Sequence, residues 1–289
     1  RPGAARAAGG PVISIGNITA GGTGKTPLVI AVVQRLAAWG RRPAILTRGY
    51  GARRGETADE VQEFHAAVPD VPVVVNPARV AGAQTARERH GADCLVLDDG
   101  FQHRRLARTL DIVVIDALDP WGGGTLLPAG RLREPLRGLR RAGLLVVSRC
   151  NQVEPAVVEH IIGALDAWAP GCPVVRATVV PVGLVDAAGA AVPLDALAGQ
   201  RVQPVCGIGN PTTFVRLLRP LAGTVRQVLA FADHHRYTAE DVRVLVAAAR
   251  QRGSDLVVTT RKDWGKLAPR WPAVGAPRLL RLDVATQLD

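Results

Sequence analysis

A glycine-rich segment near the start of the chain limits its folding more than any other feature. Residues 19–26, TAGGTGKT, follow the apolar run 12–15 and precede a helical pattern over residues 28–37. This order of strand, glycine loop and helix matches the phosphate-binding pattern G-x-x-x-x-G-K-[ST], except that Thr19 stands where a glycine is usual. In such a loop the backbone amides and the helix N-terminus face a polyphosphate, the lysine reaches its outer phosphates, and the last hydroxyl ligates Mg²⁺.

The loop therefore predicts a nucleotide-phosphate site. Its expected members are Thr19, Ala20, Gly21, Gly22, Thr23, Gly24, Lys25 and Thr26. The alternative is an ordinary glycine-rich turn between a strand and a helix.

Short apolar runs alternate with helical patterns over the first half of the chain. Candidate strands are residues 12–15, 44–47, 71–75, 94–97, 112–115 and 144–148, and candidate helices are residues 26–39, 80–89 and 154–168. Continuous apolar strands separated by helices indicate a parallel sheet covered on both faces. We therefore expect an α/β fold with a P-loop NTPase-type, doubly wound, mostly parallel sheet that binds ligands at the carboxyl ends of its strands.

The pattern changes after Gly171. We expect strands at residues 174–182, 205–208, 225–229 and 256–260, and a helix at 242–251 that follows a capping-box-like start at Thr238. This half is interpreted as a second, smaller α/β unit. The expected domains are a P-loop nucleotide-binding and catalytic domain at 1–176 and a C-terminal domain at 177–289, whose last residues are candidates for a return to the first domain.

The chain is strongly basic, with 36 Lys and Arg against 25 Asp and Glu and a formal net charge of +11. This excess favours an anionic partner, such as a nucleotide, a nucleic acid or phospholipid headgroups, unless it only reflects an Arg-rich coding bias. No apolar run reaches the roughly 18 residues of a membrane-spanning helix, and no signal peptide is visible. The chain starts at Arg1 without Met, so an anchor segment outside this chain is left open. The four cysteines lack a C-x-x-C spacing, which favours buried free thiols over zinc.

A pair of acidic residues, Asp98 and Asp99, ends the apolar run 94–97. In P-loop sites an acidic residue at a strand end holds Mg²⁺ directly or through water. Adjacent carboxylates repel each other, and a metal relieves that repulsion. We therefore predict that Thr26, Asp98 and Asp99 bind Mg²⁺; the alternative is a simple Asp-Asp-Gly turn.

Two segments of the chain are distinctive: GNITAGGTGKTP at residues 16–27 and LDDGFQH at 97–103. Further segments are TRGYG at 47–51, LPAGRLREP at 127–135, GIGNPTTF at 207–214, FADH at 231–234 and TTRKD at 259–263. In their composition and order these segments resemble the tetraacyldisaccharide 4′-kinase family. Together they extend over residues 12–266, which makes the resemblance far more specific than the P-loop alone.

The resemblance implies an enzyme that transfers the γ-phosphoryl group of ATP, with Mg²⁺, to the 4′-hydroxyl of a tetraacylated glucosamine disaccharide 1-phosphate in lipid A (lipopolysaccharide) biosynthesis. Positioning and charge neutralisation, here through Lys25, carry most of such catalysis, and a base near the acceptor alcohol helps. The resemblance implies Asp59 as that base, supported by His234 in an Asp–His relay, and Glu60 as a further metal ligand. The segment around Asp59 departs from the family's G-D-E-P, because Ala58 and Val61 replace the glycine and the proline.

Polar residues after a strand end or after the segment 128–130 are the candidates for substrate contact. They are Arg48, Tyr50, His103, Arg131 and Arg133. The guanidinium fork suits phosphate because it binds two oxygens at once. As lone features, the arginines would be solvated surface charges and the histidine a polar cap.

Two other classes of function remain open from the residues alone. A P-loop ATPase or GTPase acting as a switch or metal-insertion chaperone would share the glycine loop, but it gives no reason for residues 127–135 or 231–234 and usually carries an N-K-x-D-like segment, which is absent. A nucleic-acid binder is suggested by charge only. The kinase hypothesis predicts ATP and Mg²⁺, an acylated disaccharide phospholipid substrate, peripheral contact with the cytoplasmic face of the bacterial inner membrane, no nucleic acid, and a monomer.

Overall fold

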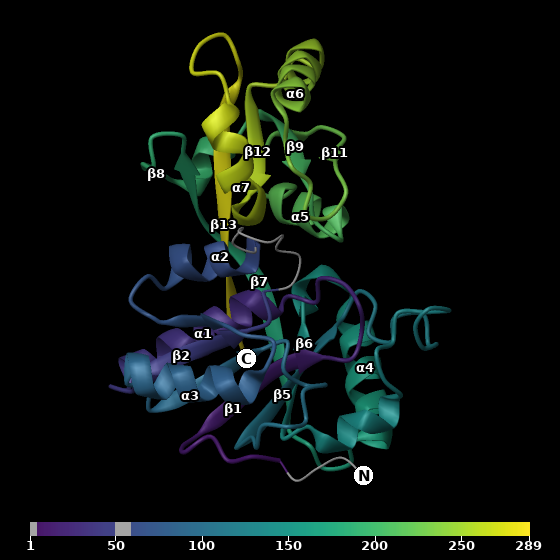
Figure 1. Ribbon diagram of the computed structural model, residues 1–289. Helices are drawn as coiled ribbons and strands as arrows, with labels where there is room; N and C mark the ends of the chain where they lie inside the picture. The colour runs from purple at the N-terminus through teal and green to yellow at the C-terminus, as the bar shows by residue number, and fades with distance from the viewer. Residues whose placement is uncertain (1–4, 50–58) are drawn as a thin grey trace. The chain divides into compact units, whose positions relative to one another are not determined.

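The computed structural model describes residues 5–49 and 59–289 (Figure 1). The chain forms two compact units: unit 1 is Arg1–Val179 with Thr286–Asp289, and unit 2 is Val180–Ala285. That they act as separate domains stays a prediction.

Unit 1 is built on a parallel sheet whose strands lie in the order β7-β6-β5-β1-β4-β2-β3. The strands are β1 (Val12–Asn17), β2 (Pro43–Thr47), β3 (Val73–Val75), β4 (Cys94–Asp98), β5 (Leu110–Asp116), β6 (Leu144–Ser148) and the first part of β7 (Val174–Asp186). Because β1 lies between β4 and β5, the glycine loop after β1 and the acidic pair after β4 leave the sheet at neighbouring strand ends.

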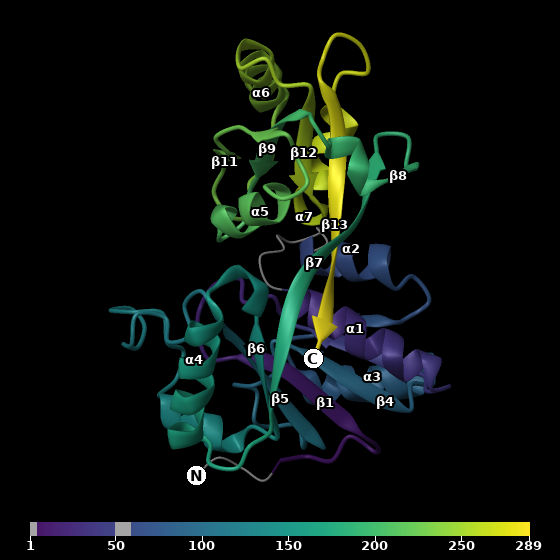
Figure 2. The same ribbon diagram turned by 180° about the vertical axis from the view of Figure 1, so that it is seen from behind.

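Helices cover both faces of this sheet (Figures 1 and 2). The helices are α1 (Lys25–Ala38), α2 (Asp59–Ala67), α3 (Arg79–His90) and α4 (Pro155–Trp168), with short 3₁₀ turns η1 (Leu136–Arg141) and η2 (Cys150–Gln152). Val96 of β4 packs in one core with α1 and α2, whereas its neighbour Leu97 packs in another with α3. Since successive strand residues point to opposite faces, α1 and α2 lie on one face and α3 on the other, where α4 also packs against Val113 and Ile115. The predicted doubly wound α/β fold is confirmed.

Unit 2 has a smaller sheet in which β9 (Arg201–Cys206) is the second strand from one edge. It contains β8 (Ala191–Val192), β10 (Thr224–Val225), β11 (Leu229–Ala230), β12 (Leu256–Thr260), β13 (Arg278–Leu288) and the latter part of β7. Its helices are α5 (Pro211–Leu218), α6 (Ala239–Gln251) and α7 (Arg261–Leu267), with 3₁₀ turns η3 (Leu194–Leu197) and η4 (Ala268–Arg270). β9 pairs in parallel with β10, β11 and β12, and β12 with β13, whereas β8 pairs antiparallel with β7.

Two apolar cores stabilise unit 2. One joins α5 and η3 to one face of the sheet, and the other joins α6 and α7 to the opposite face. The last residues of the chain belong to unit 1, where the amide of Asp289 donates to the carbonyl of Arg176 at 3.0 Å.

The predicted strand at 225–229 is wrong. Two short strands, β10 and β11, stand there, separated by residues 226–228. The amide of Arg226 still donates to the carbonyl of Val202 at 2.8 Å. The carbonyl of Gln227 instead accepts from the side chains of Gln203 and Arg252, at 2.8 and 2.9 Å. The strand expected at 205–208 also begins earlier and ends at Cys206 as β9.

None of the helices in the described residues has the length and apolar character needed to cross a bilayer. All four cysteines are free, and Cys94 and Cys206 are buried. Burial, with the nearby charge of Asp263, raises the pKa of the Cys206 thiol to about 12, so this thiol stays protonated and unreactive.

Candidate active site

The glycine loop between β1 and α1 has the conformation that a phosphate-binding turn requires. Gly21 and Gly24 have φ of 111° and 84°, in the left-handed region that favours glycine. Gly24 is the N-cap of α1 and brings no side-chain cap. Within the described part of the chain, the amides of residues 21–24 donate to no backbone carbonyl, and the buried Thr23 hydroxyl has no partner. Such a row of unpaired donors at a helix N-terminus fits the phosphates of a nucleotide.

The ammonium of Lys25 lies between an amide and a carboxylate. Its Nζ donates to Oδ1 of Asn17 at 3.2 Å and lies 3.4 Å from Oδ1 of Asp99. Asn17, the last residue of β1, in turn donates from its side-chain nitrogen to the carbonyl of Thr19 at 2.7 Å. Asn17 was not among the sequence candidates; its only signal is its position between the strand and the loop.

Asp98, the last residue of β4, is almost fully buried. It accepts a hydrogen bond from the Thr47 hydroxyl at 3.3 Å. Burial, aided by the charge of Glu60 and opposed by Lys25, raises the pKa of this carboxyl to about 7. A bound cation would favour its ionised form, so Asp98 has the environment of a carboxylate that needs a positive partner.

Asp99 is held in a different environment from that of its neighbour. Arg133 donates to both carboxylate oxygens of Asp99, at 2.8 and 2.7 Å. The ammonium of Lys25 forms an ion pair with the same carboxylate. Burial works against ionisation, but the charges of Lys25 and Arg133 outweigh it and lower the pKa of Asp99. Asp99 also has φ of 52°, an uncommon conformation for a residue with a side chain. The sequence placed Arg133 at the substrate; in this structure a single guanidinium nitrogen, Nη1, donates to both carboxylate oxygens of Asp99.

The LPAGRLREP segment is paired with the start of the glycine loop through its residues 131–133. The amide of Ala20 donates to the carbonyl of Arg131, and the amide of Arg133 donates to the carbonyl of Ile18, both at 2.7 Å. Thr19 and Leu132 form an antiparallel bridge. The Arg131 side chain forms an ion pair with Asp119. Two motifs more than 100 positions apart in the chain are therefore paired backbone to backbone.

The last residue of β6 and the residue that follows it support the other side of the glycine loop. Ser148 donates from its hydroxyl to the carbonyl of Thr23 at 2.9 Å, and Arg149 donates to the carbonyl of Gly22 at 2.8 Å. Arg149 also pairs with Asp116 at the end of β5. These contacts occupy the carbonyls of Gly22 and Thr23 and do not use the loop amides.

Arg79 at the start of α3 is a buried cation that the sequence reading missed. It donates to the carbonyls of Asn76 and Asp98 at 2.8 and 3.2 Å. Burial lowers its pKa, against the opposing charge of Asp98. Nothing in the sequence separates it from the surface arginines of the same helix.

The remaining polar candidates of unit 1 stand around this cluster. Arg48 is exposed just after β2, and its charge acts on Arg79. His103 is half-buried, and burial together with the charges of Arg79 and other arginines lowers the pKa of its imidazole, which keeps it neutral. Tyr50 lies outside the described residues.

Asp59 and Glu60 occupy the first turn of α2, where carboxylates favour the positive end of the helix dipole. The charge of Glu60 contributes to the raised pKa of Asp98, so it stands near the acidic pair. Ala58 lies outside the described residues.

Oxygen donors close to the glycine loop suit Mg²⁺. This ion is usually held by one or two carboxylates together with substrate phosphates and water rather than by a cage of protein ligands. Residues 5–49 and 59–289 contain no cluster of three or more His, Cys, Asp or Glu side chains ready to hold a metal. Thr26, Asp98, Asp99 and Glu60 stay the predicted donor set for such a phosphate-assisted site.

In unit 2, the FADH and TTRKD segments come together. Lys262 on α7 donates from Nζ to Oδ1 of Asp233 at 2.6 Å and lies 3.5 Å from Nε2 of His234. The pairing of His234 with Asp59 joins residues of different units and stays a prediction.

Asp263 is the buried centre of unit 2. Its carboxylate accepts from the amide of Gly207 at 2.9 Å and from the Thr260 hydroxyl at 2.7 Å. Its charge adds to burial in raising the pKa of the Tyr237 hydroxyl. Asp263 thus ties the start of the GIGNP segment to the start of α7.

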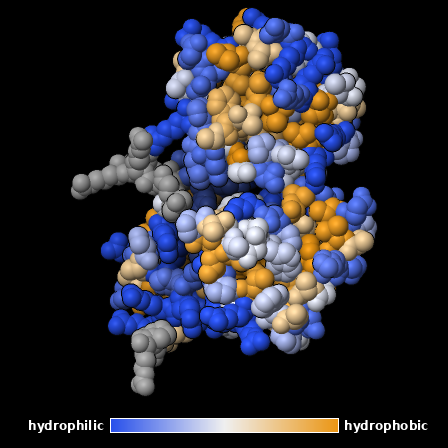
Figure 3. All heavy atoms as spheres, turned by 90° about the vertical axis from the view of Figure 1, so that its right-hand side faces the viewer, coloured by the Kyte–Doolittle hydropathy of each residue, from blue (hydrophilic) through white to orange (hydrophobic). Residues whose placement is uncertain are grey.

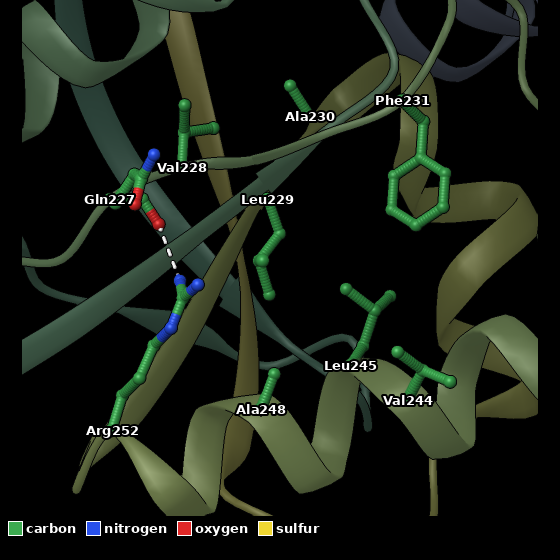
Figure 4. Close-up of a pocket in the computed structure, with 9 residues that line it drawn as sticks. All are labelled: Gln227, Val228, Leu229, Ala230, Phe231, Val244, Leu245, Ala248 and Arg252. Atoms are coloured by element: carbon green, nitrogen blue, oxygen red, sulfur yellow. Dashed lines mark hydrogen bonds between the residues drawn. The ribbon is translucent and has the colours of Figure 1, made fainter.

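A separate pocket of about 300 Å³ lies in unit 2 between β11 and α6 (Figure 4). Leu229, Val244 and Leu245 supply apolar walls, and Arg252 closes one end through its bond to Gln227. Figure 3 shows hydrophobic surface on unit 2 that is interrupted by hydrophilic residues. No predicted site residue within 5–49 and 59–289 lines this pocket.

Comparison with known proteins gives matches over nearly the whole chain. A family model described as Tetraacyldisaccharide-1-P 4'-kinase matches residues 3–288. A tetraacyldisaccharide 4′-kinase of Anaeromyxobacter dehalogenans (strain 2CP-C) is 44% identical over 298 residues, covering 97% of this chain and 79% of the relative. One from Halothermothrix orenii is 39% identical over 280 residues, covering 87% of this chain and 73% of the relative. The solved structure of LpxK from Aquifex aeolicus, in complex with ATP, has a TM-score of 0.74 at 29% identity and covers 99% of this chain and 86% of that one.

Because the family model and the relatives align with almost every residue of the chain, this protein belongs to the tetraacyldisaccharide-1-P 4′-kinase family.

Proposed function

We propose that the protein transfers the γ-phosphoryl group of ATP to the 4′-hydroxyl of a tetraacylated glucosamine disaccharide 1-phosphate, a step of lipid A biosynthesis. The observation that carries this proposal is the cluster of Lys25, Asp99 and Arg133 beside the uncapped start of α1. The family match supports the choice of acceptor over a P-loop switch or metal-insertion chaperone, for which neither the LPAG nor the FADH segment has a use.

The glycine loop and Lys25 would hold the nucleotide. The amides of residues 21–24 supply donors, and Lys25 supplies a charge that can move from Asp99 to a phosphate. Thr26, Asp98, Asp99 and Glu60 would hold Mg²⁺, which neutralises charge on the transferred phosphoryl group. ATP binding by the relative from Aquifex aeolicus supports the nucleotide.

The acceptor side of the reaction needs a base and a binding surface. Asp59 would take the proton of the sugar hydroxyl, with His234 supporting it. Arg48, Tyr50, His103, Arg131 and Arg133 are the candidates that hold the substrate's polar parts. We place the reaction at the cytoplasmic face of the inner membrane, where the basic protein meets acidic lipid, and expect a monomer that does not bind nucleic acid.

The deciding experiment is transfer of ³²P from labelled ATP to the tetraacylated disaccharide 1-phosphate in detergent micelles with Mg²⁺. We expect labelled lipid from the parent protein and at least about a hundredfold less from Lys25→Ala, since a positioned charge of this kind contributes several kcal/mol to transfer. Arg35→Ala, which removes a charge from the exposed far end of the same helix, is the matched control and should keep parental activity.

ATP hydrolysis without labelled lipid would favour the switch or chaperone hypothesis. Unchanged transfer by Lys25→Ala would refute the assignment of the glycine loop.

A further inference from the structure

The carboxyl ends of β5 and β6 contact the glycine loop but have no part in the function proposed above. Asp116 ends β5 and Ser148 ends β6, and these two residues face each other in the parallel pairing of the strands. Arg149 follows Ser148 and forms an ion pair with Asp116, in which the side chains of Arg149 and Asp116 are only 12% and 10% exposed. Because burying two charges costs desolvation energy, such a pair is weak evidence for a stabilising role and favours a positional one.

Ser148 and Arg149 both bind carbonyls of the glycine loop. The Ser148 hydroxyl donates to the carbonyl of Thr23 at 2.9 Å. The guanidinium of Arg149 donates from Nη1 to Asp116 and from Nη2 to the carbonyl of Gly22, the latter at 2.8 Å. Two successive carbonyls of the loop are therefore held by two consecutive residues at the end of β6.

The planarity of the peptide bond makes these contacts a constraint on the loop amides. The carbonyl of one residue and the amide of the next share one rigid plane, and in the trans form they point in opposite directions. The peptide bonds that follow Gly22 and Thr23 are trans. The Arg149 contact therefore directs the amide of Thr23 away from Arg149, and the Ser148 contact directs the amide of Gly24 away from Ser148.

The amides of Thr23 and Gly24 are donors that a phosphate can meet. In the residues that the structure describes, neither of them donates to a backbone carbonyl. Gly24 has φ of 84° and is the N-cap of α1. Amides at a left-handed residue and a helix N-terminus form a concavity for an anion. If the two carbonyls were not held, the ligand itself would have to order this glycine-rich backbone, which lowers its affinity.

The backbone around Arg149 is held by the ends of both strands. Arg149 has φ of 60°, an uncommon conformation for a residue with a side chain, which persists where the surroundings hold it. The amide of Ala117, after β5, donates to the carbonyl of Ser148 at 3.0 Å. Asp116 accepts through Oδ1 from the amide of Leu118 at 3.2 Å. The guanidinium is therefore fixed by two central strands of the sheet.

We infer that Ser148 and Arg149 are positioning residues for the glycine loop: by holding two successive carbonyls, they turn the amides of Thr23 and Gly24 toward the nucleotide phosphates before a nucleotide binds. Asp116 in turn fixes the guanidinium. This inference rests on the proposed function for the identity of the ligand. Both residues act through the loop backbone, so they contribute to the binding of the phosphates and not to the transfer step.

Nucleotide binding tests the inference without any reaction. ADP carries the α- and β-phosphates that such a loop cradles, whereas AMP carries the α-phosphate alone. We expect Arg149→Met to bind ADP about tenfold more weakly than the parent by calorimetry, and AMP at most about twofold more weakly, because the ligand must then order the loop itself.

The control for this measurement is Arg176→Met. It removes a half-exposed arginine that pairs with Glu159 in the same unit, and it should keep parental affinities. An equal loss of ADP and AMP affinity in Arg149→Met would assign Arg149 to the nucleoside, and a parental ADP affinity would remove its role. Either result would overturn the inference.

Two more variants separate the contact from the burial of charge. Arg149→Met leaves the buried Asp116 without its arginine, which destabilises the fold. The double variant Arg149→Met/Asp116→Asn removes that charge and should show the same loss of ADP affinity. Ser148→Ala keeps the ion pair and should weaken ADP binding about threefold, since one hydrogen bond is lost. Parental ADP affinity in either of these variants would overturn the inference.

Kinetics show how the contact acts. Because a bound nucleotide itself orders the loop, Arg149→Met should raise the KM for ATP about tenfold and change kcat by less than about twofold, and Arg149→Lys should recover part of the loss. A lower kcat at an unchanged KM would place Arg149 in the transfer step and overturn the inference. A parent protein that transfers no phosphoryl group, while the ADP affinities differ as expected, would instead refute the proposed function and leave the role of Ser148 and Arg149 standing.

Discussion

Replacement of Gly16 by alanine tests how closely the acidic motif must approach the glycine-loop strand. Gly16 lies in β1, and a β-carbon added there would stand 2.6 Å from Cβ and 2.7 Å from the backbone nitrogen of Phe101. Phe101 is fully buried, and Arg141 lies over its ring at 4.3 Å. Neither colliding atom is the far end of a flexible side chain, so β1 and the turn after Asp99 must separate.

The energetic cost follows from this crowding. Overpacking in a close-packed core costs about 1–3 kcal/mol, and collision with both a backbone atom and a β-carbon puts Gly16→Ala near the upper end. For a domain of 150–250 residues, 1 kcal/mol shifts the midpoint of thermal unfolding by about 2–4 °C, so we expect Gly16→Ala to lower it by roughly 6–12 °C.

Gly163→Ala is the matched control. Gly163 is an exposed residue within α4, and an added β-carbon meets nothing within 4 Å. Alanine in a helix interior is more stable than glycine by roughly 0.5–1 kcal/mol, so this variant should melt about 1–4 °C higher than the parent.

Thermal unfolding followed by circular dichroism measures both variants. The same substitution in two places should give opposite signs, because crowding decides one and backbone entropy the other. A Gly16→Ala protein as stable as the parent would refute the reasoning, since it would mean that the acidic turn does not press against β1.

Two further predictions concern the charges of the site. Because burial raises the pKa of Asp98 from 3.8 to about 7, the folded protein binds its proton more tightly than the unfolded chain. In EDTA, the contribution of Asp98 to the free energy of unfolding is therefore full below about pH 4 and is lost as the pH rises through about 7. The Asp98→Asn variant should lack this decline and should melt at a higher temperature than the parent at pH 8. Melting temperatures of the two proteins that run parallel against pH would contradict the assignment. In Arg133→Met, Lys25 is the remaining cation beside Asp99, so its ammonium is held more tightly by this carboxylate and is less available to phosphates. The side chains of Arg133 and Asp99 are 27% and 37% exposed, so solvent screening reduces the expected effect to about 1 kcal/mol. This corresponds to about fivefold weaker ADP binding, measured by calorimetry. Arg131→Met is the control there, and equal ADP affinity in both variants would show that Arg133 does not tune Lys25.

The central strands of both units were predictable because their apolar runs are uninterrupted. The strands expected at 144–148 and 256–260 have the bounds of β6 and β12, and the capping box expected at Thr238 starts α6. The same holds for the glycine loop and the acidic pair, whose chemistry depends on short local spacing.

Elements whose polar residues are satisfied only by tertiary contacts were missed. β13 was not predicted from the sequence, because the charged residues Arg281 and Asp283 interrupt its apolar pattern. In the structure, Asp283 forms ion pairs with Arg281 and with Arg261 of α7. α2 buries only Val61 and Phe64, too few to show a helical period.

Site residues were also missed where only a tertiary contact gives them their role. Arg79 looks like any surface arginine until the fold buries it against the carbonyl of Asp98. The assignments of Asp59, His234 and the substrate-binding arginines stay predictions. The first two come from the family resemblance, and the arginines come from their position in the chain and from the affinity of guanidinium for phosphate.

The backbone pairing between residues 18–20 and 131–133 has a consequence for how this sequence can change. An insertion or deletion in one segment would shift the register of the other, so the two segments must vary together during evolution. A chimera that imports the glycine loop of another kinase should therefore also import the partner segment from the same donor. Grafting one without the other would join mismatched halves of a single structural module.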